Sequence, residues 1–124
     1  MDIINSDQAP KAIGPYSQAI RAGNVIYTSG QIALDPATGA LVEGDFAAQV
    51  HRVFANLNAV LAAGGATFSN VAKATVYLTD LANFTTLNEI YASYFGDTKP
   101  ARTTVGVAQL PKGGLVEIDL IAIV

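Results

Sequence analysis

The chain has 124 residues, of which 51% are hydrophobic and 14% are charged, and its formal net charge is -3. This acidic balance argues against general nucleic-acid binding, which needs a basic surface that displaces counterions. The absence of cysteine excludes disulfides, thiolate catalysis and cysteine metal sites.

The chain carries no targeting signal that we can identify. Its opening stretch, MDIINSDQAP, has neither the basic nor the apolar segment of a signal peptide. No apolar run reaches the roughly 18 residues that a membrane-spanning helix needs. These absences indicate a cytoplasmic location. The length is typical of a single domain that spans residues 1–124. A domain of this size cannot hide so much apolar surface alone, so we expect part of it to be buried between subunits.

The first half of the chain predicts two strands and a helix. Residues 17–32, SQAIRAGNVIYTSGQI, are typical of two short strands around a turn at 22–24, and DPATG (35–39) is a further turn. Asp45 can cap a helix that Gly64 and Gly65 end. Its apolar stripe comprises Phe46, Val50, Val53, Phe54, Leu57, Val60 and Leu61.

The second half predicts a strand, a helix and two strands. VAKATVYLTDL (71–81) alternates, which puts Ala72, Ala74, Val76 and Leu78 on one face. A helix follows from about Phe84 to Phe95, and LPKGG joins two terminal strands. Two helices can cover only one face of this sheet. Because the strand near residue 120 is apolar on both faces, the uncovered face needs another subunit.

Two opposite charges occupy the terminal strands. Arg102 shares a strand face with Thr104, and Glu117 shares one with Asp119. We expect Arg102 and Glu117 to lie on the sheet face that the helices leave uncovered and to face one solvent-reachable crevice. The alternative is a structural ion pair between adjacent strands.

Three further polar residues are candidates for the same site. Tyr16 follows the stiff Gly14-Pro15 turn, Ser29 lies in TSGQ, and Asn88 lies in or beside the apolar stripe of the second helix. Their alternatives are packing for Tyr16, a turn hydrogen bond for Ser29 and a satisfied polar group for Asn88. The lone histidine, His51, excludes a histidine metal cluster, and no glycine-rich phosphate-binding motif is present.

Six blocks of the sequence together resemble the RidA family, also called the YjgF/YER057c/UK114 family. They cover nearly the whole chain in order: AIGPYSQAI, TSGQI, VYLTDLANF, NEIY, PARTTVGVAQLP and VEIDLIAI. The resemblance implies an α+β, chorismate-mutase-like fold, in which two α-helices back a mixed sheet. It also implies a homotrimer with active sites in clefts between subunits.

The resemblance implies hydrolysis of 2-imino acids, or their enamine tautomers, to 2-keto acids and ammonia, without a cofactor or metal. Arg102 matches the arginine that holds the substrate carboxylate, and Glu117 matches the glutamate that positions water. Tyr16, Ser29 and Asn88 match residues that line the cleft, as does Thr104. Many members have cysteine at this last position. Because this chain has Thr104 there and no cysteine at all, a thiol has no role here.

Two other functions stay open on the sequence. The same cleft could serve a regulatory protein that senses a small carboxylate. Some relatives have been assigned RNA cleavage or translation inhibition, against which the acidic balance and the single histidine argue.

Overall fold

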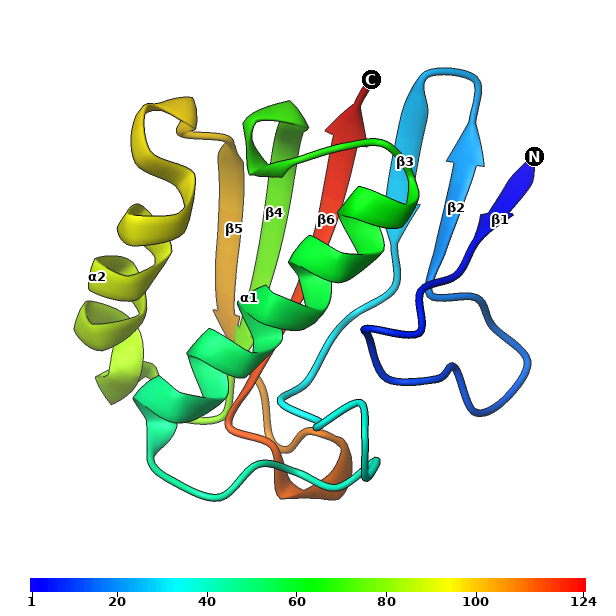
Figure 1. The fold of residues 1–124 in the computed structure, drawn as a ribbon. Coiled ribbons are helices and arrows are strands. Elements are labelled where there is room, and N and C mark those ends of the chain that lie inside the picture. The colour runs from blue at the N-terminus through cyan, green and yellow to red at the C-terminus, as the bar shows by residue number, and fades with distance from the viewer.

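The computed structural model describes residues 1–124 and contains one six-stranded sheet and two α-helices (Figure 1). The strands are β1 (Asp2–Ile4), β2 (Ala19–Ala22), β3 (Val25–Thr28), β4 (Val71–Leu78), β5 (Ala101–Gly106) and β6 (Val116–Ile123). The helices are α1 (Phe46–Ala63) and α2 (Phe84–Phe95). The strand order is β1-β2-β3-β6-β4-β5, and only the β4–β5 pair is parallel. The expected mixed α+β sheet with two helices is therefore confirmed.

Both helices lie on the same face of the sheet (Figure 1). Between this face and the helices lies a cluster of 24 buried residues, in which the α1 stripe meets alternate residues of β4 and β6. Phe54 of α1 is fully buried and stacks on Tyr94 of α2, with ring centroids 4.4 Å apart. Burial of apolar and aromatic area supplies most of the free energy that holds helices to sheet.

Helix α1 begins and ends where the sequence predicts. The Asp45 side chain accepts a hydrogen bond from the Ala48 N–H at 3.0 Å, and the Gly64 N–H bonds back to the last turn. These contacts satisfy backbone groups that a helix end leaves free. Helix α2 also has the expected bounds, with Leu87, Tyr91 and Phe95 buried. No helix combines the length and the apolarity that crossing a membrane requires.

Three details differ from the sequence predictions. The short strand β1 was not expected, because three residues are too few to show a period. Ala72 is exposed, since an irregularity between Val71 and Lys73 shifts the β4–β6 register and turns Val71 into the core instead. The terminal strands β5 and β6 are not neighbours, because β4 lies between them.

The sheet face away from the helices is open and largely apolar. Its exposed side chains include Ile3, Tyr27, Val105 and Ile123, contributed by four different strands. The face also carries Tyr77, Glu117 and Asp119 of the central strands. An apolar surface of this extent marks an interaction site rather than a solvated face.

Asn56 is a buried polar side chain that ties α1 to the segment after β3. Its amide group donates to the carbonyls of Ile32 and Leu34 at 3.3 and 3.0 Å, and its oxygen accepts from Arg52. Asn56 is fully buried. The Ile32 carbonyl also accepts from the Leu34 N–H at 2.8 Å, whereas the Leu34 carbonyl depends on Asn56. The Asn56 side chain thus fixes residues 32–34, which border a cavity.

We predict that Asn56→Leu lowers the free energy of unfolding by about 1 to 3 kcal/mol, because it leaves the Leu34 carbonyl without a donor and removes one of the two donors of the Ile32 carbonyl. Chemical denaturation measures this loss. The matched control is Asn58→Leu on the exposed side of the same helix, which should change stability by no more than about 0.5 kcal/mol. Equal effects of the two substitutions would contradict the role given to Asn56.

Candidate active site

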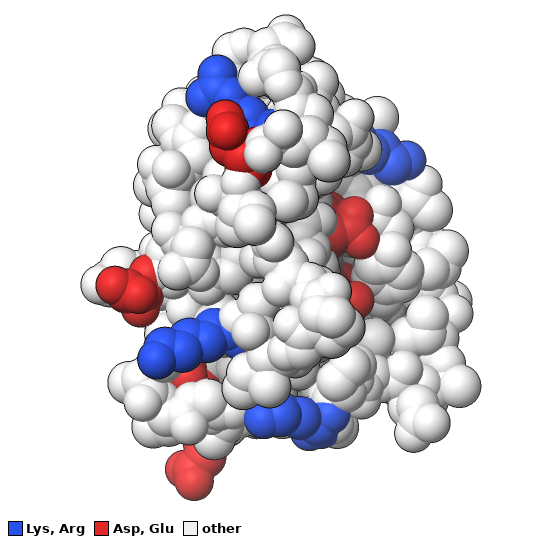
Figure 2. Space-filling view, turned by 90° about the vertical axis from the view of Figure 1, so that its right-hand side faces the viewer, with Lys and Arg blue, Asp and Glu red and all other residues white.

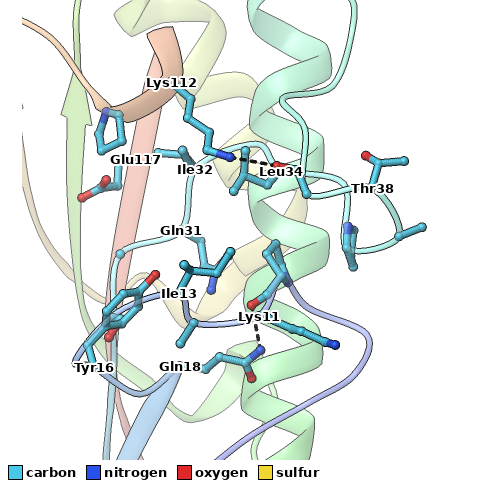
Figure 3. A pocket seen from close by; sticks show the side chains of 18 residues that line it. Lys11, Ile13, Tyr16, Gln18, Gln31, Ile32, Leu34, Thr38, Lys112 and Glu117 are labelled. Carbon is cyan, nitrogen blue, oxygen red and sulfur yellow. Dashed lines mark hydrogen bonds between the residues drawn. The ribbon is translucent and has the colours of Figure 1, made fainter.

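A cavity of about 820 Å³ lies beside the N-terminal end of β6 (Figure 3). Its walls come from residues 10–18, 29–39 and 111–112 and from Glu117. Three of the predicted site residues, Tyr16, Ser29 and Glu117, line it. Lys112 reaches across it and donates to the Gly39 carbonyl at 3.1 Å. A volume of this size suits a small ligand.

Glu117 is held at the cavity by the strand pairing around it. Val116 and Ile118 are buried under the helices, so Glu117 points to the opposite, open face. Gln31 and Ile118 exchange both backbone hydrogen bonds, which places the loop 29–32 beside β6. Gly30 faces the carboxyl group so closely that a Cβ at Gly30 would lie 2.5 Å from Oε2 of Glu117. A side chain at this point would therefore displace the Glu117 carboxyl group from its present position.

The chain makes Glu117 a weaker acid than an ordinary glutamate. Burial raises its pKa, and the negative charge of Asp119 raises it further, with no cation acting in the other direction. Asp119 itself accepts a hydrogen bond from the Tyr77 hydroxyl at 3.0 Å. Ionised Glu117 is thus left in need of a positive partner.

Tyr16 and Ser29 are positioned by local backbone bonds. Gly14 has a φ of 127°, which favours glycine, and the Tyr16 N–H bonds to the Gly14 carbonyl at 2.9 Å. The Tyr16 ring is largely exposed at the cavity mouth. Ser29 donates its hydroxyl proton to the Ser17 carbonyl at 2.6 Å, as its structural alternative predicted. Its oxygen still presents lone pairs toward the cavity.

Arg102 does not lie where the sequence predicted. In the parallel β4–β5 pair it is opposite Ala74, whose side chain is buried under the helices, so Arg102 points toward α2. Its guanidinium carbon lies 4.8 Å from the centre of the Tyr91 ring and 5.5 Å from that of Phe84. The expectation that Arg102 lies on the uncovered face is wrong. A guanidinium packs favourably against the aromatic rings of α2. The alternation of residues along the strand does not reveal this contact.

The six predicted residues therefore form two groups. Tyr16, Ser29 and Glu117 surround the cavity, whereas Arg102 and Thr104 face α2, on which Asn88 lies half-buried between the turns of Phe84 and Tyr91. Within one chain the two groups are on opposite faces of the sheet. The alternative of an ion pair between adjacent strands is also wrong, because β4 separates β5 from β6.

Sequence reasoning missed two residues of these groups. Gly30 was not singled out, although TSGQ was. Tyr91 was assigned only to the core stripe, because a tyrosine at helical spacing gives no sign that an arginine lies over its ring. The lone histidine, His51, is exposed and bonds to the Tyr94 hydroxyl through its Nδ1 at 2.7 Å, away from both groups.

Known proteins resemble this chain over its whole length. The family model described as Endoribonuclease L-PSP matches residues 6–124. The chain belongs to this family, the RidA (YjgF/YER057c/UK114) family. Protein DfrA of Myxococcus xanthus is 57% identical, over 97% of this chain and 93% of that protein. A 2-iminobutanoate/2-iminopropanoate deaminase of Bos taurus is 49% identical, over 98% and 88%.

The fold agrees with that of a solved member of the family. The crystal structure of RidA from the Antarctic bacterium Psychrobacter sp. PAMC 21119 superposes with a TM-score of 0.96 at 45% identity, over all of both chains. The expected family is thereby confirmed. So is the expected class, since relatives at this identity are named as deaminases, enzymes that act on C–N bonds.

We predict that Asp119→Asn lowers the pKa of Glu117, because it removes a neighbouring negative charge and keeps an acceptor for Tyr77. A titration of the Glu117 carboxyl carbon by NMR measures the change. Asp97→Asn, in the exposed turn after α2, is the control and should leave the Glu117 pKa unchanged. An unchanged Glu117 pKa in Asp119→Asn would contradict the electrostatic account.

The sign of the stability effect follows from the raised pKa. The folded chain holds the Glu117 proton more tightly than the unfolded chain does. The resulting stabilisation is complete below the unfolded pKa and is lost as the pH rises through the folded pKa. Asp119→Asn should therefore weaken the fall in stability across this acidic window, as thermal unfolding at a series of pH values will measure.

Proposed function

We propose that this protein hydrolyses small 2-imino acids, such as 2-iminobutanoate and 2-iminopropanoate, to 2-keto acids and ammonia. The observation that carries the proposal is a carboxylate, Glu117, in a cavity of suitable size, in a chain that also presents an arginine with no acidic partner of its own. The deaminase of Bos taurus supports the same substrate class.

The active site in this proposal is completed between two chains. Glu117 lies on the open face and lacks a cation, while Arg102 lies on the edge strand β5 with its guanidinium over aromatic rings of α2. A closed homotrimer in which each open face packs against its neighbours satisfies both needs. The Arg102 group of one subunit then faces the cavity of the next, and the apolar sheet face is buried.

The two charged residues have distinct roles in the reaction. Arg102 binds the substrate carboxylate with two parallel N–H donors, which fixes the plane of the adjacent C=N group. Ionised Glu117 accepts a proton from water as the water oxygen attacks the imine carbon. Protonated Glu117 then gives its proton to the nitrogen of the resulting carbinolamine. As the C–N bond breaks and ammonia leaves, the carbinolamine hydroxyl returns its proton to Glu117, which leaves the ketone. Positive charge on the protonated imine is stabilised by the same carboxylate.

The pairing of Arg102 with Glu117 also adjusts the base. In one chain the pKa of Glu117 is raised by burial and by Asp119. A guanidinium from the neighbouring subunit opposes these two effects, which favours the ionised form of Glu117 at neutral pH. Tyr16, Ser29, Asn88 and Thr104 line the cleft in this arrangement. Neither a cofactor nor a thiol is part of the proposed chemistry.

Two alternatives belong to other classes. A regulatory protein would bind the same carboxylate without turning it over, so ammonia release from 2-iminobutanoate above the spontaneous rate separates the two. The family description favours an endoribonuclease. However, the chain has only 7 lysine and arginine residues against 10 acidic ones, and on the face shown in Figure 2 the basic side chains are scattered among acidic and neutral ones. RNA backbones need a continuous basic surface.

We predict that Arg102→Ala and Arg102→Lys each lower kcat/KM for 2-iminobutanoate by at least about 100-fold, because both lose the two-pronged grip that orients the substrate. The substrate is generated with a threonine dehydratase, and ammonia release is measured. Arg21→Lys on β2, whose side chain bonds only to Gly23, is the matched control and should retain activity. Full activity of Arg102→Ala would reject the proposed role.

A further inference from the structure

Two buried hydroxyl groups near Arg102 have no hydrogen-bond partner. They are the phenol oxygen of Tyr91 and Oγ1 of Thr104. Tyr91 is only 9% exposed, although its side chain ends in a polar group. A buried hydroxyl without a partner costs free energy, and native proteins leave few of them unless a ligand or water supplies the missing bond.

Both hydroxyls belong to the surroundings of Arg102. The Tyr91 ring lies under the guanidinium at 4.8 Å, and Thr104 is two residues farther along β5 on the same strand face. No other buried side-chain oxygen or nitrogen of the chain lacks a partner. Tyr94, one turn away on α2, bonds to His51, and Thr28 on β3 donates nothing but accepts from the Leu120 N–H. The buried hydroxyls without a partner thus occur only around Arg102.

Hydrogen-bond capacity indicates what these groups would bind. A carboxylate has about four lone-pair positions, and the arginine fork fills two of them. Two hydroxyl donors beside the guanidinium match the remaining two. Burial raises the pKa of Tyr91, an effect that the Arg102 charge only partly opposes, so the phenol keeps its proton and can donate.

We propose that Tyr91 is a further binding residue of the site, and that its hydroxyl, together with that of Thr104, donates a hydrogen bond to the carboxylate that Arg102 holds. The inference rests on the proposed function for the identity of the ligand. Its ring also positions the guanidinium by a cation–π contact. Because both hydroxyls are buried in the single chain, a covering side chain has to move as the ligand enters.

The test compares two Tyr→Phe variants on one helix. Tyr91→Phe keeps the ring under Arg102 and removes only the unpartnered hydroxyl, whereas Tyr94→Phe removes a hydroxyl that is already bonded elsewhere. Calorimetry measures the Kd for 2-oxobutanoate, the stable product, and the deaminase assay measures KM and kcat. Thermal unfolding without ligand is recorded for each variant.

We expect Tyr91→Phe to raise both Kd and KM about tenfold, as loss of one hydrogen bond to a charged group predicts. The ligand-free Tm should be unchanged or higher, because an unsatisfied buried group is removed. Tyr94→Phe should leave Kd and KM unchanged. In a Thr104→Val background, which removes the second hydroxyl, the Kd should rise further.

Other outcomes overturn the inference. A lower Tm with unchanged Kd in Tyr91→Phe would mean that a buried water satisfies the hydroxyl and that its role is structural. Equal losses in Tyr91→Phe and Tyr94→Phe would mean a general effect on α2. A wild-type protein that binds 2-oxobutanoate without releasing ammonia from the imine would refute the proposed function alone, because the Kd values would still test Tyr91.

Discussion

The register of the central strand β4 with its two neighbours is the constraint on which the rest depends. Parallel pairing sets Arg102 opposite Ala74, and antiparallel pairing sets Glu117 opposite Tyr77. Residues 74 and 77 are an odd number apart, so their side chains lie on opposite faces. Because a slip by one residue would reverse every side chain and expose the core, burial of Ala74, Val76 and Ile118 fixes both charges at once.

This constraint links folding to function. One chain contains every residue of the proposed site, yet its two halves cannot meet there. The same open face that separates them is apolar enough to require a partner. In the proposed assembly, packing between chains buries the face, supplies Glu117 with a guanidinium and forms the cleft. Stability and activity should depend on protein concentration together, since both come from one interface.

The sequence predicted the elements better than their contacts. Periods of 3.6 and 2 residues located both helices and the longer strands, because each element has one strongly apolar side. Strand order was not predictable in this way. Arg102 and Glu117 lie in strands that are consecutive in the sequence, β5 and β6, so adjacency was the natural expectation, but β4 inserts between them. Only the register could show which face each charge occupies.

The candidate site residues were recognisable for a related reason. Glu117, Tyr16 and Ser29 stand out because polar groups in an apolar strand or beside a stiff turn need an explanation, and the structure brings these three to one cavity. Tyr91 did not stand out, because a buried tyrosine on a helix stripe satisfies the pattern of a core residue. Its unpartnered hydroxyl is visible only when the neighbours are known. Local sequence patterns thus single out residues that need an explanation, whereas the contacts of a side chain in the structure indicate what that residue can do.

The central claim is that Arg102 of one chain works with Glu117 of another, and co-assembly of two inactive variants tests it most directly. Arg102→Ala and Glu117→Gln chains, each inactive alone, are co-expressed at equal levels and purified as one assembly. In a cyclic trimer every mixed assembly contains one intact site, so random mixing predicts about a quarter of wild-type activity. No recovery of activity in verified mixed assemblies would contradict the account, because a site within one chain cannot be restored by a partner.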